Sequence, residues 1–540
     1  MIKFLSMALC AATMPVMAQT DLIDYKQPVP YTPKFKMVKQ NNVGIYPKLK
    51  DAPIWNGERK GFYSLKFKIN GLKPGDEVYL ADNYNGNKYL RDTTVVDKKG
   101  LATFEKNIRL QRGVYLFVMP EKRGFFEFIV ADNLNFTIET DTSYYQQEYY
   151  TKMKVKDDEE NAAFANYQIE KIKIAERLIA LDKLLADTTL SAPKKKTFNE
   201  QRNNIMRDKS NFDRKYINDN PTHFLSRFLN ALIEIKVPEE LPIDPKTGLA
   251  DSAFPYKYYK AHYWDNVDLG EDGLIRAPIH IVKQKLDFYW DNVVILHPDS
   301  AYKAAKELVD RAENTVDLQR FMIWYHVNKF ETSKIMGLDK AFVLLARETY
   351  LAGKAWWADS TTIANVGVNA RERGGSLVGN KGADLMLMTT SPQILEKNNG
   401  SPWVKLYDLK AKYKILIFWD PTCGHCREVV PKLAEIYNKN MDKGWVVLGL
   451  TQEDKSKEFD EFMNAHPMVK NWIHLQRGTV PSKEYEANLR QYYVIASPTI
   501  FVLDEDNVIQ ANRMDVEKLE EFIEQLEKIK EYKKKAESKN

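Results

Sequence analysis

Two of the three cysteines in this 540-residue chain, Cys423 and Cys426, form a Cys-X-X-Cys pair. Such a pair can cycle between a dithiol and a disulfide, and the thiolate is its reactive form. A structural disulfide and a metal site are the alternatives. A closed loop of four residues restricts the unfolded chain little, and neither a second cysteine pair nor a His-x₃-His motif lies nearby to complete a zinc site. The pair is therefore interpreted as redox-active, with no metal.

The flanking segments predict where the pair lies. Residues 414–419 form an apolar, β-prone run typical of a buried strand, and an Asp-Pro-Thr turn follows. After the pair, apolar residues recur at helical spacing, at Val429, Val430, Leu433, Ile436 and Tyr437. At the start of a helix, unpaired N–H groups and the helix dipole stabilise a thiolate. We expect Cys423 to be the nucleophile and Cys426 the resolving thiol, with His425 adding a positive charge when protonated.

The N-terminus predicts export. An apolar run over 4–17 follows a basic start, and small residues precede Gln19, a pattern typical of a signal peptide over 1–18. Leu9 precedes Cys10 where a lipoprotein signal has a small residue, so we expect no lipid anchor. No later run approaches the roughly 18 apolar residues that span a bilayer. The predicted localisation is the periplasm or the cell envelope.

The amino-acid composition limits the kinds of partner that this chain can bind. The 79 Lys and Arg residues nearly balance the 74 Asp and Glu residues, which gives a formal net charge of +5. A net charge this small for the length of the chain predicts no nucleic-acid partner. Apart from His425, the histidines stand singly, so no metal partner is expected either. A hydrophobic content of 44% supports several folded cores.

Four regions are expected after the signal peptide. Period-two alternation over 62–142 favours a small antiparallel β-sandwich, within a β module over 19–150. Helical periodicity follows in a segment over 151–245 and in an aromatic-rich helical module over 246–375. Its aromatic residues are interpreted as core, with a peptide or substrate groove as the alternative. A Gly-rich stretch then leads into a C-terminal region over 376–540.

The C-terminal region resembles the thioredoxin family. Its expected order of strand, helix, strand, helix, strand and helix is that of an α/β thioredoxin fold. Pro431 stands where thioredoxins kink the active-site helix, and Ser497-Pro498-Thr499 resembles the cis-proline loop that faces the cysteines in that family. The long interval between Cys426 and Pro498 is similar to that of exported TlpA/ResA-type thiol-disulfide oxidoreductases.

The whole chain also resembles multi-domain exported thioredoxin-like proteins of the Bacteroidota, in which a β-rich module and a helical module precede the redox domain. The segments 261–269, 324–336 and 418–426 carry this likeness. The last segment contains Trp419 and Gly424. The resemblance implies that these two residues, with His425, Pro431 and the proline loop, tune the cysteines or face the substrate.

The resemblance implies an enzyme that needs no cofactor beyond its own redox-active disulfide. Its substrates would be disulfide-containing exported proteins of the envelope, and a membrane thiol electron donor would keep it reduced. A disulfide isomerase or oxidase is an alternative, because Gly-His between the cysteines resembles protein disulfide isomerases. A binding or scaffold protein with a vestigial redox domain is the other alternative.

Two positions depart from the family pattern. Thioredoxins carry a buried acid six residues before the first cysteine, where this chain has Ile417. ResA-type proteins place a glutamate three residues after the second cysteine, where this chain has Val429. Glu428 is adjacent, but one residue turns a helix by about 100°. The proton acceptor for Cys426 is therefore not assigned from the sequence.

Overall fold

The computed structural model divides into two compact units. One comprises residues 1–295 with 308–321, and the other comprises 296–307 with 322–540. The predicted signal peptide, with Cys10, lies outside the residues that the structure describes. The described ranges are 22–23, 62–142, 146–243, 248–388, 395–396, 399–451, 456–476 and 483–537.

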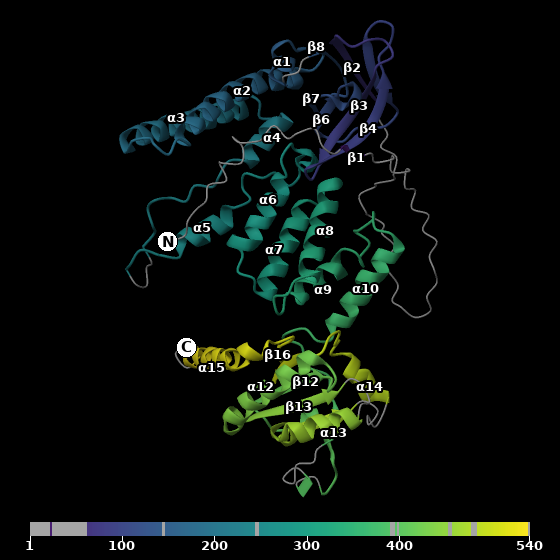
Figure 1. Cartoon of the computed structure of the whole chain (residues 1–540), viewed down its shortest axis with the longest axis vertical. Coiled ribbons are helices and arrows are strands. Elements are labelled where there is room, and N and C mark those ends of the chain that lie inside the picture. The colour runs from purple at the N-terminus through teal and green to yellow at the C-terminus, as the bar shows by residue number, and fades with distance from the viewer. Residues whose placement is uncertain are drawn as a thin grey trace. The chain divides into compact units, whose positions relative to one another are not determined.

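The β module is built from short strands (Figure 1). They are β1 (Leu22–Ile23), β2 (Tyr63–Asn70), β3 (Glu77–Tyr84), β4 (Asn87–Val95), β5 (Leu101–Lys106), β6 (Gly113–Val118), β7 (Phe125–Val130), β8 (Asn135–Asp141) and β9 (Lys154–Lys156). One sheet has the order β1-β4-β3-β6-β7 and the other β5-β2-β8-β9. The rings of Phe67 in β2 and Phe117 in β6 lie 4.7 Å apart between centroids, so the two sheets share a core.

The predicted sandwich is confirmed, but two of its strand pairs, β1 with β4 and β2 with β8, are parallel, which the sequence did not indicate. In β2 the alternate residues Tyr63, Leu65, Phe67 and Ile69 are buried, as their period of two requires. However, β2 pairs parallel with β8, whereas its other neighbour, β5, is antiparallel. The alternation within one strand carries no information on the direction of its partner. The sandwich is therefore mixed rather than purely antiparallel.

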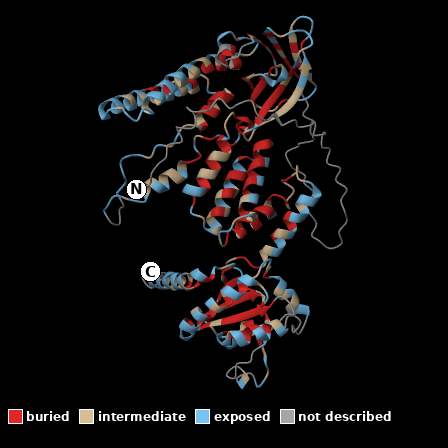
Figure 2. Cartoon of the chain, viewed as in Figure 1, coloured by how far each residue is buried: buried red, intermediate tan, exposed pale blue. Residues whose placement is uncertain are grey.

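Helices follow the β module. They are α1 (Gln146–Thr151), α2 (Glu159–Leu185), α3 (Ala192–Asp219), α4 (Phe224–Ala231), α5 (Phe254–His262), α6 (Ile281–Phe288), α7 (Pro298–Arg311), α8 (Asp317–Glu331), α9 (Asp339–Glu348) and α10 (Ser360–Gly374). The long helices α2 and α3 are separated by the charged, proline-containing connection that the sequence shows near 191–196. The hairpin that they form is largely exposed, whereas the helices after α5 have many buried residues (Figure 2).

Of the 18 Phe, Trp and Tyr residues over 246–375, nine are buried and seven are half-buried. Tyr263, Trp264 and Trp290 are buried, and the Tyr263 and Tyr289 rings stack with centroids 5.2 Å apart. Trp324 differs, since 47% of its surface is exposed. The core interpretation therefore accounts for the larger share of these rings.

Within the first unit, a buried cluster of charges joins the β module to the helices. Arg276, at the end of the short helix η3 (Asp272–Arg276), is only 3% exposed. Its Nε lies 3.1 Å from Asp82 Oδ2 in β3, and its Nη2 donates to the carboxylate of Asp317 at the start of α8. Asp272 in turn accepts the backbone N–H groups of Asp317 and Leu318, both at 2.8 Å. Segments far apart in the sequence therefore meet at one guanidinium group.

The C-terminal domain is a seven-stranded sheet with the order β11-β10-β14-β13-β12-β15-β16. Its strands are β10 (Met386–Met388), β11 (Trp403–Lys405), β12 (Tyr413–Trp419), β13 (Trp445–Thr451), β14 (Ile473–Gln476), β15 (Thr499–Asp504) and β16 (Ile509–Ala511). Its helices include α12 (Gly424–Asn440), α13 (Ser456–Ala465), α14 (Lys483–Arg490) and α15 (Leu519–Glu537). The predicted thioredoxin order of elements is confirmed.

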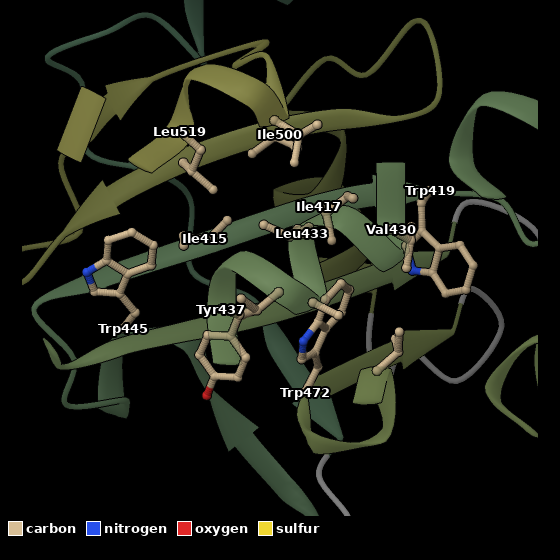
Figure 3. Packing of buried hydrophobic residues seen from close by; sticks show 14 of the residues in the cluster. Ile415, Ile417, Trp419, Val430, Leu433, Tyr437, Trp445, Trp472, Ile500 and Leu519 are labelled. Carbon is tan, nitrogen blue, oxygen red and sulfur yellow. The ribbon is translucent and has the colours of Figure 1, made fainter. Parts of the chain in front are cut away.

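Strand β12 forms the centre of this domain. It pairs parallel with β13 and antiparallel with β15, and all seven of its residues are buried. Ile415, Ile417 and Trp419 lie on the face that α12 covers (Figure 3), while Leu416 and Phe418 belong to the cluster on the other face. Because both faces are covered, the run over 414–419 is uniformly apolar rather than alternating, apart from the buried Lys414.

Candidate active site

The two cysteines occupy the turn between β12 and α12, as predicted. Cys423 is the N-cap residue of α12, and its carbonyl accepts the N–H of Arg427 at 3.2 Å. Cys423 is partly exposed, whereas Cys426 has no exposed surface, and both are free thiols. The first cysteine can therefore meet another molecule, and the second can react only with what is already beside it. This geometry supports the predicted nucleophile and resolving thiol, whose roles remain predictions.

The turn that precedes the pair is held by Asp420. Its Oδ1 accepts the N–H and the hydroxyl of Thr422, each at 2.7 Å, and its carbonyl accepts the N–H of Cys423 at 3.1 Å. The backbone N–H of Asp420 donates to the sulfur of Cys426 at 3.4 Å. Asp420 thus stabilises the turn through its side chain and donates a hydrogen bond to the buried sulfur through its backbone. The sequence placed this residue in the turn but did not indicate the bond to sulfur.

Burial dominates the chemistry of Cys426. It raises the pKa of this thiol to about 12, while the bond from the Asp420 amide opposes the shift and the neighbouring Cys423 side chain adds to it. Ile417 and Val430, both fully buried, belong to the same apolar cluster (Figure 3). An apolar surrounding destabilises the charged form of a thiol, so Cys426 stays protonated at neutral pH.

The departures from the family pattern are visible in the structure. Ile417 is fully buried in the cluster that contains Cys426, and Val429 packs against the edge of that cluster. Glu428 is exposed. At both positions where the related families carry an acid, this chain therefore places an apolar side chain, and the donor to Cys426 Sγ is the backbone amide of Asp420.

The proline loop meets the cysteine pair. The carbonyl oxygen of Ser497 lies 3.6 Å from Cys423 Sγ, and the Ser497–Pro498 peptide bond is cis. Thr499 is buried and donates its hydroxyl to the carbonyl of Ala496 at 2.6 Å. Residues 74 positions apart in the sequence thus meet where β12 ends and β15 begins.

The other predicted site residues take different places. Gly424 and His425 are exposed in the first turn of α12, next to Cys423. Pro431 lies inside α12, as the resemblance implied. Trp419 is fully buried, and its ring contacts Phe459 and Phe462 of α13. It can therefore act on the site through packing and cannot offer a surface to a substrate.

His474 is a half-buried titratable residue on the same sheet, with its ring enclosed by aromatic side chains. Its Nε2 lies 2.9 Å from the carbonyl oxygen of Val469, and its ring packs against Phe459 and Trp472. Burial lowers its pKa to about 4, so this imidazole is neutral at pH 7. In the described part of the chain, no group of three or more His, Cys, Asp or Glu side chains is arranged to hold a metal ion.

Comparison with known proteins gives a match for each region. Residues 411–509 match the thioredoxin-like family, and residues 63–164 and 198–355 match two domains of unknown function. A thiol-disulfide oxidoreductase ResA of Bacillus thuringiensis subsp. konkukian is 27% identical over 126 residues, which are 23% of this chain and 68% of the relative.

Two solved bacterial structures are similar to parts of this chain. A domain of a possible thiol-disulfide isomerase from Cytophaga hutchinsonii is 32% identical, with a TM-score of 0.24, over 29% of this chain and 97% of that chain. A thioredoxin-like protein from Bacteroides caccae is 19% identical, with a TM-score of 0.38, over 53% of this chain and 98% of that chain.

The C-terminal domain of this chain belongs to the thioredoxin-like family. It has the fold and the cysteine pair of a thiol-disulfide oxidoreductase, and the β-rich and helical regions that precede it agree with the multi-domain resemblance.

Proposed function

We propose that this protein is an exported thiol-disulfide oxidoreductase that reduces disulfides in proteins of the cell envelope. The observation that carries the proposal is the arrangement at the start of α12. A partly exposed Cys423 caps the helix 3.6 Å from the Ser497 carbonyl, and Cys426 lies buried behind it. The curated relatives in the comparison are named as thiol-disulfide oxidoreductases, which supports the same chemistry.

The reaction follows from these positions. The Cys423 thiolate attacks one sulfur of the substrate disulfide, which forms a mixed disulfide and releases the first substrate thiolate. Cys426 then loses its proton and attacks Cys423 Sγ, which forms the Cys423–Cys426 disulfide and releases the second substrate thiolate. Two electrons pass from the dithiol to the substrate. An external dithiol, proposed to be a membrane thiol donor, returns two electrons and restores the reduced pair.

The proline loop is suited to hold the substrate during attack. An extended segment can add to exposed backbone groups as a strand would, and the loop presents its backbone beside Cys423. The apolar sequence over 4–17 supports export, which would bring the protein to disulfide-bonded partners. In the part of the chain that the structure describes, no helix is both long and apolar enough to cross a bilayer.

Insulin reduction by the purified mature chain, with a dithiol as the electron source, tests the proposal. We expect Cys423→Ser to abolish the reaction, because the nucleophile is lost. Cys426→Ser should still attack once and then remain as a mixed disulfide, which mass spectrometry detects as a covalent adduct. The double variant is the control for direct reduction by the dithiol. Equal activity of Cys423→Ser and the parent chain would reject the proposal.

The location is tested separately. The protein purified from the envelope fraction of its native host should begin at Gln19, with the predicted signal removed. Recovery of an intact Met1 from the cytosolic fraction would contradict export and leave the thiol chemistry untouched.

A disulfide isomerase is the second candidate. The exposed Gly424-His425 dipeptide favours it, because a protonated imidazole beside Cys423 stabilises the thiolate and makes the couple more oxidising. Recovery of activity of scrambled ribonuclease, at a rate above that of insulin reduction, would favour the isomerase.

A further inference from the structure

A third segment lies near the end of β12, where the cysteines and the proline loop meet. It consists of residues 512–514, between β16 and the short helix η8 (Val516–Lys518). Met514 donates its N–H to the carbonyl of Ile500 at 3.0 Å, two residues beyond Pro498. Met514 also packs against the apolar cluster that contains Cys426. Segment 512–514 therefore lies beside the strand that follows the proline loop, and we call segment 512–514 and the proline loop together the rim.

Asn512 fixes this rim segment to the helical region. It is buried, and its Nδ2 donates to Asp339 Oδ2 at 2.8 Å and to the Ser376 carbonyl at 3.0 Å. Asp339 begins α9 in the helical region, and Ser376 follows α10 at the start of the C-terminal region. A buried amide whose two N–H groups both find acceptors has a defined orientation. All of these residues lie in the second compact unit.

A second contact reaches the segment that leads into the proline loop. A Cβ atom on Gly375, at the end of α10, would lie 2.7 Å from the carbonyl oxygen of Gln491. The two backbones therefore touch, and only glycine fits at this position without a shift. A third contact is Met336, between α8 and α9, which packs against the Cys426 cluster. The helical region thus contacts segment 512–514 of the rim and the segment that leads into the proline loop.

We infer that the α9–α10 part of the helical region positions the substrate-binding rim of the redox site, through Asp339 on Asn512 and through Gly375 on Gln491. This inference rests on the proposed function. The partner that would bind such a rim is an extended polypeptide that carries a disulfide. Only a ligand long enough to contact both segments binds more tightly when the two segments are aligned. Ile495, on the loop before Pro498, is 65% exposed and offers this polypeptide an apolar contact. A small disulfide needs only the sulfur of Cys423.

The test compares two substrates in the full mature chain, insulin and the small aromatic disulfide dithiobis(nitrobenzoate). Asp339→Leu removes the acceptor of the Asn512 bond and should raise KM for insulin about tenfold with kcat unchanged, as expected for the loss of about 1.4 kcal/mol of binding. The rate with the small disulfide should stay within a factor of about two. Asp339→Asn keeps an acceptor oxygen and should restore the KM for insulin.

Asp359→Ala is the matched control. Asp359 caps the opposite end of α10 by accepting the N–H of Thr362 at 2.7 Å, so its loss weakens the helical region without touching the rim. It should leave both substrates unaffected. If Asp339→Leu does not fold, Asn512→Ala supplies the same test, because it removes the donor of both bonds.

The outcomes separate this inference from the proposed function. An active parent chain with an unchanged KM for insulin in Asp339→Leu overturns the inference alone. An equal loss of activity toward insulin and toward the small disulfide also overturns the inference, because a general structural effect would then explain the change. A parent chain that reduces neither substrate overturns the proposed function instead.

Discussion

Two buried polar sites in this chain show opposite ways to place an ionisable group in a core. Cys426 is surrounded by apolar residues such as Ile417 and Val430, and burial raises its pKa to about 12, which keeps it neutral. Arg276 is equally buried, but the carboxylates of Asp317 and Asp82 outweigh the cost of burial and raise its pKa well above the usual range, which keeps it charged. The difference lies in the partners and not in the depth of burial.

The two arrangements suit different purposes. A neutral thiol with one weak backbone donor can change its bonding at little cost, since it can lose a proton and form a disulfide. A guanidinium group bonded to two carboxylates cannot change without leaving buried charges unpaired. We therefore interpret the Arg276 cluster as a fixed joint between the β module and the helices, and Cys426 as a reactive group.

The largest expected effect comes from breaking this joint. Arg276→Leu removes the buried guanidinium that Asp82 and Asp317 share, leaves Asp82 with Arg91 alone, and should destabilise the first unit by about 3–5 kcal/mol. Urea unfolding followed by the protease resistance of the β module measures this loss. Arg91→Leu is the control, because Arg91 contacts the same Asp82 carboxylate at 2.8 Å from a partly exposed position. It should cost less than about 1 kcal/mol, and equal costs for the two variants would refute the joint.

The next effect concerns the ionisation of Cys426. In Cys423→Ser, the ultraviolet absorbance of the Cys426 thiolate, measured against the double variant Cys423→Ser/Cys426→Ser, should rise about tenfold for each unit between roughly pH 7 and 10, because the thiolate fraction rises in this way below a pKa of about 12. An ordinary thiol would level off near its pKa of about 8.5. A plateau at that pH would show that burial does not control this thiol.

The smallest expected effect is electrostatic tuning at the exposed cysteine. His425→Pro removes a side chain that stabilises the Cys423 thiolate when it is protonated, and so should make the couple more reducing by tens of millivolts, where about 30 mV corresponds to 1.4 kcal/mol. Proline is tolerated in the first turn of a helix. His425→Gln is the matched variant, because it removes the charge and keeps the backbone donor. If only the proline variant shifts the potential, the backbone and not the charge is responsible.

The sequence predicted one of these sites and not the other, for a physical reason. The strand over 414–419, the turn and the helix that hold the cysteines are contiguous, and local patterns describe contiguous segments well. The proline loop, 74 residues away, was found only because it resembles a known family. The Arg276 cluster joins Asp82, Asp272 and Asp317, and no pattern within any one segment records their meeting.

The contacts of the rim illustrate the same limit. Asn512 and Asp339 are 173 residues apart and carry no motif, so only the three-dimensional structure brings them together. The parallel pairing of β2 with β8 is another example, because hydrophobic alternation fixes which face of a strand is buried and not the direction of its neighbour.

The most direct test of the central claim is the reduction potential of the Cys423–Cys426 couple. The mature chain is equilibrated in glutathione buffers of graded ratio and then alkylated, and the oxidised fraction is measured by mass spectrometry. We expect a single two-electron transition, with a slope of about 30 mV for each tenfold change, at a potential between about −270 and −180 mV. A pair that forms no disulfide at any ratio would contradict the redox assignment, and a potential near −120 mV would identify an oxidant in place of a reductase.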